Sequence, residues 1–202
     1  MSSHHFVKEQ QEPALLILTT EGWDLPTLNS LLEWVPTVLV TQETVFQVLS
    51  LGIKVDVIVG HPEFHQDNEG LSEAQFPVKF VPAVDNDYLD ASIAYLNQST
   101  HHAVNILAFD PTASKNLEPY LDLMDIVFVC EGFRYSPARK GIFQKWLPKT
   151  TIQLQGKEGQ MVTHKTAKKT ELINLTPAAS FEVPEGMHWF ESDGLFWMGT
   201  RL

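Results

Sequence analysis

Short runs of Val, Ile and Leu alternate with segments of helical spacing over much of the chain, from residue 14 to residue 130. Such runs indicate buried strands, and apolar residues repeating every three or four positions indicate helices. We expect strands at residues 14–18, 37–40, 55–59, 78–81, 104–108 and 126–130. We expect helices at residues 26–34, 44–51, 87–98 and 116–124, and a loop or short helix at residues 65–77. This alternation predicts βαβ units and therefore an α/β fold with a parallel sheet.

The composition of the chain changes after about Arg134, where Pro and Gly residues become frequent. Short candidate strands separated by turn residues follow, at residues 151–155, 159–164, 171–175, 180–183, 188–191 and 195–198. Regular short strands of this kind predict a small C-terminal antiparallel β module. We therefore expect two domains, at residues 14–147 and 150–202, with the boundary near Leu147 to Thr150.

Composition excludes some classes of function. The formal charge is −11, from 25 acidic and 14 basic residues, and this balance disfavours a nucleic-acid binder. No apolar run approaches the roughly 18 to 20 residues that span a bilayer, so we expect no membrane partner. Cys130 is the single cysteine, which rules out an intrachain disulfide and fits a reducing cytoplasm.

Several common site motifs are missing from the sequence. There is no Gly-x-Gly-x-x-Gly after a strand, no phosphate-binding loop ending in Gly-Lys-Ser/Thr, and no Gly-x-Ser-x-Gly elbow. No Cys/His spacing resembles a zinc site. His101 and His102 are adjacent, so their side chains diverge, and we expect them at a solvated helix end.

Two polar groups follow predicted strands. His61 and Glu63 come after the strand at 55–59, and Asp87 and Asp90 open the helix at 87–98. Ligands of open α/β sheets bind beyond the carboxyl ends of the strands, and carboxylates gathered there could hold Mg²⁺. Two simpler interpretations stay open: an ordinary polar loop at 61–65, and Asp residues that only complement the dipole of a helix N-terminus.

Three stretches resemble the thiamin pyrophosphokinase family. Leu51 to Gly60, LGIKVDVIVG, is similar to the family's Leu-Gly-Ile and Pro-Asp-Leu-Ile-Ile text before its Gly-Asp-Phe-Asp-Ser signature. Asp87-Tyr88-Leu89-Asp90 resembles the family's Asp-x-Thr-Asp, and Ser192 to Trp197 resembles its Thr-Lys-Gly-Leu-x-Trp strand. The resemblance implies a Rossmann-like nucleotide-binding domain followed by a β-sandwich. It also implies a homodimer that transfers diphosphate from ATP to thiamin with Mg²⁺.

The same comparison shows departures from the family pattern. His61 and Glu63 stand where the family has two Asp residues, and Leu89 replaces the Thr of the second signature. The family's Asp-Gly-Gly falls on residues 42–44, Gln-Glu-Thr. Its Arg-x-Asp-His falls on residues 113–116, Ala-Ser-Lys-Asn, so that side-chain chemistry is lost. Imidazole is a poorer Mg²⁺ ligand than a carboxylate, and the extra methylene of Glu63 displaces its charge.

The resemblance assigns roles to particular residues. It implies catalytic roles for Asp87, Asp90 and Glu63, and a metal site made of His61, Glu63, Asp87 and Asp90. It implies cofactor-binding roles for Gln42, Glu43, Gly60 and Trp197. Two main hypotheses follow: a divergent thiamin pyrophosphokinase, or a non-catalytic homodimer that binds a nucleotide or another small ligand. A structural homodimer without a ligand is the third.

Overall fold

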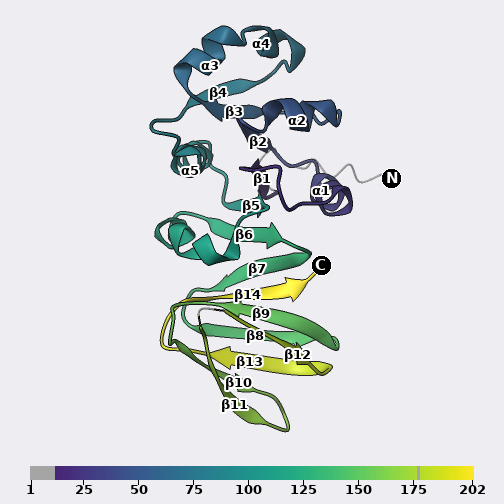
Figure 1. Cartoon of the computed structure of the whole chain (residues 1–202), viewed down its shortest axis with the longest axis vertical. Helices are drawn as coiled ribbons and strands as arrows, with labels where there is room; N and C mark the ends of the chain where they lie inside the picture. Colours follow the sequence, from purple (N-terminus) through teal and green to yellow (C-terminus); the bar gives the residue numbers. More distant parts are fainter. Residues whose placement is uncertain (1–11, 177) are drawn as a thin grey trace, which may run out of the picture. The chain divides into compact units, whose positions relative to one another are not determined.

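The computed structural model describes residues 12–176 and 178–202, and these residues form two compact units (Figure 1). The first unit contains the chain up to Ala108 together with Asp122–Asp125, and the second contains Phe109–Leu121 and Ile126–Leu202. The expected boundary at 147–150 lies inside the second unit, in the turn between two of its strands. The division into domains at residues 14–147 and 150–202 stays a prediction.

The first unit is built around a parallel sheet with strand order β5-β1-β2-β3-β4. Every residue of β1, β2 and β3 is buried, which matches the continuous apolar runs expected of strands covered on both faces. β4 is the last strand in this order and is partly exposed. The elements are β1 Ala14–Ile17, α1 Leu25–Leu32, β2 Val38–Thr41, α2 Val45–Ser50, β3 Val57–Gly60, α3 Pro62–Asp67, α4 Gly70–Ala74, β4 Lys79–Pro82, α5 Tyr88–Gln98 and β5 Ala103–Leu107.

Local sequence signals explain where these helices begin and end. The Asp24 carboxylate accepts a hydrogen bond from the backbone N–H of Thr27 at 2.7 Å, and Pro26 occupies the first turn of α1. Gly52 follows α2 with a φ of +75°, the left-handed conformation that commonly ends a helix. The expected strands and helices of this unit are therefore confirmed in order, with small shifts at their ends.

The second unit contains two antiparallel sheets, with strand orders β12-β9-β14-β7-β6 and β11-β10-β13-β8. Their facing sides enclose a core that includes Leu154, Val162, Phe190 and Phe196. The elements are the 3₁₀ helix η1 Pro111–Tyr120 and the strands β6 Asp125–Cys130, β7 Phe133–Ala138, β8 Ile142–Leu147, β9 Thr150–Gln155, β10 Met161–Lys165, β11 Thr170–Asn174, β12 Ala178–Val183, β13 Gly186–Glu191 and β14 Phe196–Arg201. The predicted antiparallel module is thus present, and it is larger than expected.

Three sequence expectations were wrong. Strands β7 and β8 were not predicted, because Pro137 and Gly141 suggested loop; Pro137 lies within β7, and Gly141 makes the turn after it. The helix expected at 116–124 is instead a 3₁₀ helix ending at Tyr120, with Pro119 inside it. His101 is not solvated: it is 4% exposed, and its ring nitrogens lie 3.0 Å from Ser99 Oγ and 3.1 Å from Thr37 Oγ1.

Along the described ranges, no helix is long and apolar enough to cross a membrane.

Candidate functional site

The loops that follow β2 and β3 meet at the carboxyl edge of the parallel sheet. Gln42 Oε1 accepts a hydrogen bond from the backbone N–H of His61 at 2.7 Å. A Cβ atom at Gly60 would lie 2.8 Å from the same Gln42 oxygen, so only glycine permits this approach. Gln42 and Gly60, both predicted cofactor-binding residues, therefore hold these two loops together.

The loop after β2 is fixed by a buried hydroxyl. Thr44 is 2% exposed, and its Oγ1 donates to the carbonyl of Ile17 at 3.1 Å. The same oxygen accepts from the backbone N–H of Thr41 at 3.0 Å. These bonds link the ends of β1 and β2 through the loop that follows β2.

His61 belongs to a hydrogen-bonded chain of side chains. Its Nε2 lies 2.7 Å from Asn86 Oδ1. The Tyr88 hydroxyl lies 3.1 Å from Asn86 Oδ1 and 3.3 Å from Glu43 Oε1, and its single proton is donated to one of these two acceptors. Burial, together with the nearby Glu43 carboxylate, raises the pKa of Tyr88, so its hydroxyl stays a donor. Asp85 and Asn86 have φ values of +51° and +60°, an uncommon pair of left-handed residues that places Asn86 toward His61.

The predicted carboxylates have separate local roles. The Asp87 carboxylate caps α5, accepting from the backbone N–H of Asp90 at 3.1 Å, as the helix-capping interpretation expects. Glu63 lies exposed in the first turn of α3, where its charge complements the helix dipole.

The predicted metal site requires several donor side chains close to one another. Among the described residues, no three or more His, Cys, Asp or Glu side chains form a group that could hold a metal ion. The set His61, Glu63, Asp87 and Asp90 therefore does not fit Mg²⁺, which needs several oxygen ligands at short range. The metal-binding and catalytic roles of these four residues stay predictions that this arrangement does not support.

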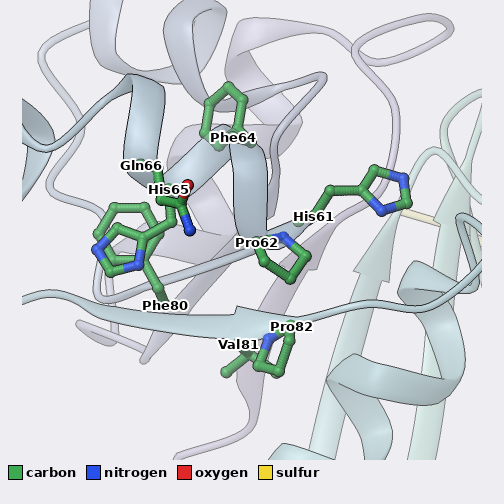
Figure 2. Close-up of a pocket in the computed structure, with 9 residues that line it drawn as sticks. His61, Pro62, Phe64, His65, Gln66, Phe80, Val81 and Pro82 are labelled. Carbon is green, nitrogen blue, oxygen red and sulfur yellow. The ribbon is translucent and has the colours of Figure 1, made fainter.

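A pocket of about 250 Å³ opens beside His61 (Figure 2). His65 stacks on Phe80, with ring centroids 3.9 Å apart, and the His61 imidazole points away from this pair, as Figure 2 shows. Its walls are mostly apolar and include no Lys, Arg, Asp or Glu; the lining residues are Gly60, His61, Pro62, Phe64, His65, Gln66, Phe80, Val81 and Pro82. Such walls suit an uncharged ring better than a polyphosphate.

Trp197, the remaining predicted cofactor-binding residue, lines a different cavity, of about 300 Å³, in the second unit. It is 2% exposed and packs on Phe128, with ring centroids 5.0 Å apart. Its Nε1–H has no hydrogen-bond partner among the described residues. Charged and polar side chains, among them Lys115, Lys157 and the buried Gln155, also line this cavity.

Sequence reasoning missed Asn86, Tyr88, His65 and Phe80. Asn86 and Tyr88 flank the predicted Asp87, but no motif marked them. His65 and Phe80 stack only because β3 and β4 pair in parallel, and such contacts between distant segments leave little signal in a single sequence.

The fold described above is that of the thiamin pyrophosphokinases. The chain is similar to the enzyme from Geobacillus thermodenitrificans, with a TM-score of 0.69 and 15% identity over 94% of this chain and 97% of that one. It is also similar to the enzymes from Bacillus subtilis (TM-score 0.67, 13% identity, 94% and 99% covered) and Candida albicans (0.66, 12%, 94% and 90%). No family model and no curated protein sequence matches the chain. The expected resemblance is thus confirmed at the level of the fold.

Proposed function

We propose that the protein is a divergent thiamin pyrophosphokinase-like protein that binds a small molecule, and that diphosphate transfer from ATP to thiamin is weak or lost. This proposal rests on the positions of the predicted carboxylates in the structure. Asp87 caps a helix, Glu63 lies exposed at another helix start, and the described residues gather no metal-holding group. The fold together with this arrangement of carboxylates favours binding over transfer.

Phosphoryl transfer depends on positioning and on cationic groups that stabilise developing charge. Mg²⁺ would supply that charge when bound, but the donors that the chain offers do not fit it. The pocket beside His61 offers apolar walls and a stacked His65–Phe80 pair instead. We therefore assign this pocket to a flat, uncharged ring such as a pyrimidine or a nucleobase.

Active transfer is the second candidate, and the overall likeness to the three enzymes named above favours it. Under this hypothesis Asp87, Asp90 and Glu63 are the residues that act on ATP and thiamin. Gln42, Glu43 and Trp197 would then contact the substrates.

One pair of measurements separates the candidates. Calorimetric titration with thiamin, ATP and thiamin diphosphate should detect binding of one of them to the intact protein. An assay with thiamin, ATP and Mg²⁺ should give little thiamin diphosphate. Turnover that disappears in Glu63→Ala and Asp90→Ala would overturn the binding-only proposal, and absence of binding to all three molecules would overturn both candidates.

The ring pocket has its own test. His65→Ala removes the stacking partner of Phe80 and should weaken binding of the ring ligand about fivefold, the effect of losing roughly 1 kcal/mol of aromatic contact. His102→Ala, a change at an exposed histidine in the same unit, is the matched control and should bind as the unchanged protein does. Equal affinity of the His65 variant would place the ligand elsewhere.

We also propose that the protein acts in the cytoplasm as a homodimer, as the resemblance implies. The single cysteine supports the compartment. The exposed Trp146 on β8, paired with the exposed Met187 on β13 in the second unit, supports self-association.

A further inference from the structure

Two histidines are buried in the second unit, far in sequence from the candidate site. His164 on β10 is 3% exposed and His188 on β13 is 1% exposed. Their ring planes are 18° apart with centroids 5.1 Å apart, and His164 also stacks on Phe190 at 4.4 Å. Buried imidazoles need hydrogen-bond partners, so their contacts define their protonation.

These rings form a chain of three contacts between two acceptors. Glu171 Oε1 lies 2.9 Å from His164 Nδ1, and His164 Nε2 lies 2.8 Å from His188 Nδ1. His188 Nε2 lies 2.9 Å from the carbonyl oxygen of Pro184. The carbonyl can only accept, and an ionised carboxylate can only accept.

Two neutral imidazole rings cannot supply a hydrogen for each of the three contacts. A neutral His188 that donates to Pro184 must accept at Nδ1, so His164 donates from Nε2 and presents a bare Nδ1 to Glu171. If His164 instead donates from Nδ1 to Glu171 and His188 donates from Nδ1 to His164, then His188 Nε2 faces the Pro184 carbonyl without a hydrogen. Two neutral imidazoles bring two N–H groups to three contacts, so one contact always sets two acceptors against each other.

We propose that the Glu171–His164–His188 chain is a buried binding site for one proton, which the two imidazoles share. The proton comes from solvent and occupies the bare ring nitrogen at the contact that lacks a hydrogen. The resulting imidazolium is paired with the Glu171 carboxylate, and all three contacts become hydrogen bonds. In that state the chain ties β10, β11 and β13 to the segment at Pro184.

The surrounding charges direct the proton to a ring rather than to Glu171. The Lys169 ammonium pairs with Glu171 Oε2, and the bonds from Lys169 and His164 lower the pKa of Glu171. The titratable and charged groups that face His164 are Glu171, His188 and Lys169, while Phe181 and Phe190 give it apolar surroundings. Burial lowers the pKa of His164 and the Glu171 bond opposes this, so uptake belongs on the acid side of the ordinary histidine range.

Nitrogen-15 NMR of the imidazoles in the full-length protein tests the site. At pH 8 both rings should be neutral, with one nitrogen of each carrying hydrogen. On acidification the signals of His164 and His188 should move together with one common midpoint, at a total of one proton. Separate midpoints, one full proton on each ring, or no uptake before acid unfolding would overturn the proposal.

Glu171→Gln is the decisive variant, because a glutamine amide can donate to a bare Nδ1 and complete the chain without the extra proton. It should lower the common midpoint by about one to two pH units, the worth of one hydrogen bond to a charged group. Glu182→Gln, at an exposed position on β12, makes the same change away from the chain and should leave the midpoint unaltered. An unchanged midpoint in Glu171→Gln would show that the carboxylate does not hold the proton.

Discussion

At the scale of single residues, Gly60 shows how a backbone position can shape the candidate site. We expect Gly60→Ala to destabilise the protein by about 1–3 kcal/mol, the usual range for overpacking, because its Cβ would press on Gln42. Urea unfolding would measure the change. Gly70→Ala is the matched control: an added Cβ there meets nothing within 4 Å, and alanine favours the helix. Equal losses in the two variants would contradict this account.

A second prediction at the residue scale concerns Tyr135. Burial, with Cys130 and Glu131 nearby, raises the pKa of Tyr135 to about 12, from 10.0 in a solvated tyrosine. The folded state thus holds this proton more tightly than the unfolded state. Its contribution to stability is complete below about pH 10 and is lost as the pH rises toward 12, by roughly 2–3 kcal/mol.

Unfolding curves collected between pH 9 and pH 12 would check this prediction. Tyr135→Phe should be less stable at neutral pH, since Gln153 loses its hydroxyl partner, but it should lose less stability at alkaline pH. A parallel decline of the two proteins would rule out Tyr135 as the source.

At the scale of elements, the turn between β7 and β8 depends on Gly141. Its φ is +68°, and a Cβ there would lie 2.0 Å from the carbonyl oxygen of Ser192. That approach accompanies a hydrogen bond of 2.7 Å from the backbone N–H of Ser192 to the carbonyl of Gly141. The hairpin β7–β8 is therefore joined to the loop between β13 and β14 at this point.

We expect Gly141→Ala to destabilise the second unit far more than Gly159→Ala. Gly159 has a similar φ, +79°, but free space around it, so its variant should cost only the roughly 1–2 kcal/mol of a left-handed alanine. Chemical unfolding of both variants isolates the steric part as the difference between them. Similar values would mean that the Ser192 loop yields easily.

Several apolar side chains are exposed on the sheet β11-β10-β13-β8 of the second unit. Trp146 on β8 is 54% exposed and lies opposite Met187 on β13, which is 40% exposed. Leu172 on β11 and Met161 on β10 are exposed on the same sheet. The exposed Trp146–Met187 pair is a candidate for an association surface.

At the scale of the whole molecule, we expect light scattering to give the mass of a dimer, about twice 22.8 kDa. Trp146→Lys should shift the mass toward the monomer, because a buried unpaired ammonium is costly at an interface. Trp34→Lys, at a tryptophan that is 69% exposed in the first unit, should keep the mass unchanged. A monomeric unchanged protein would contradict the homodimer proposal.

The order of elements in the first unit could be predicted because buried parallel strands leave continuous apolar runs such as residues 14–17 and 57–59. Strands β7 and β8 could not, since β8 has mostly exposed side chains and β7 contains Pro137. The place of the site was predictable from Gly60 and the strand before it. Its chemistry was not, because the partners of His61 and His65 come from Asn86 and Phe80, whose approach depends on tertiary folding.

Strand β4 closes one end of the parallel sheet, and its composition bears on behaviour in concentrated solution. A free strand edge is a template on which other chains can stack into aggregates. β4 is only four residues long, begins at the charged Lys79, and ends at Pro82, which has no N–H to donate. A strand from another molecule would find few residues to pair with on β4, together with the Lys79 ammonium group and a proline without a backbone N–H. This edge of the sheet therefore resists polymerisation into fibres.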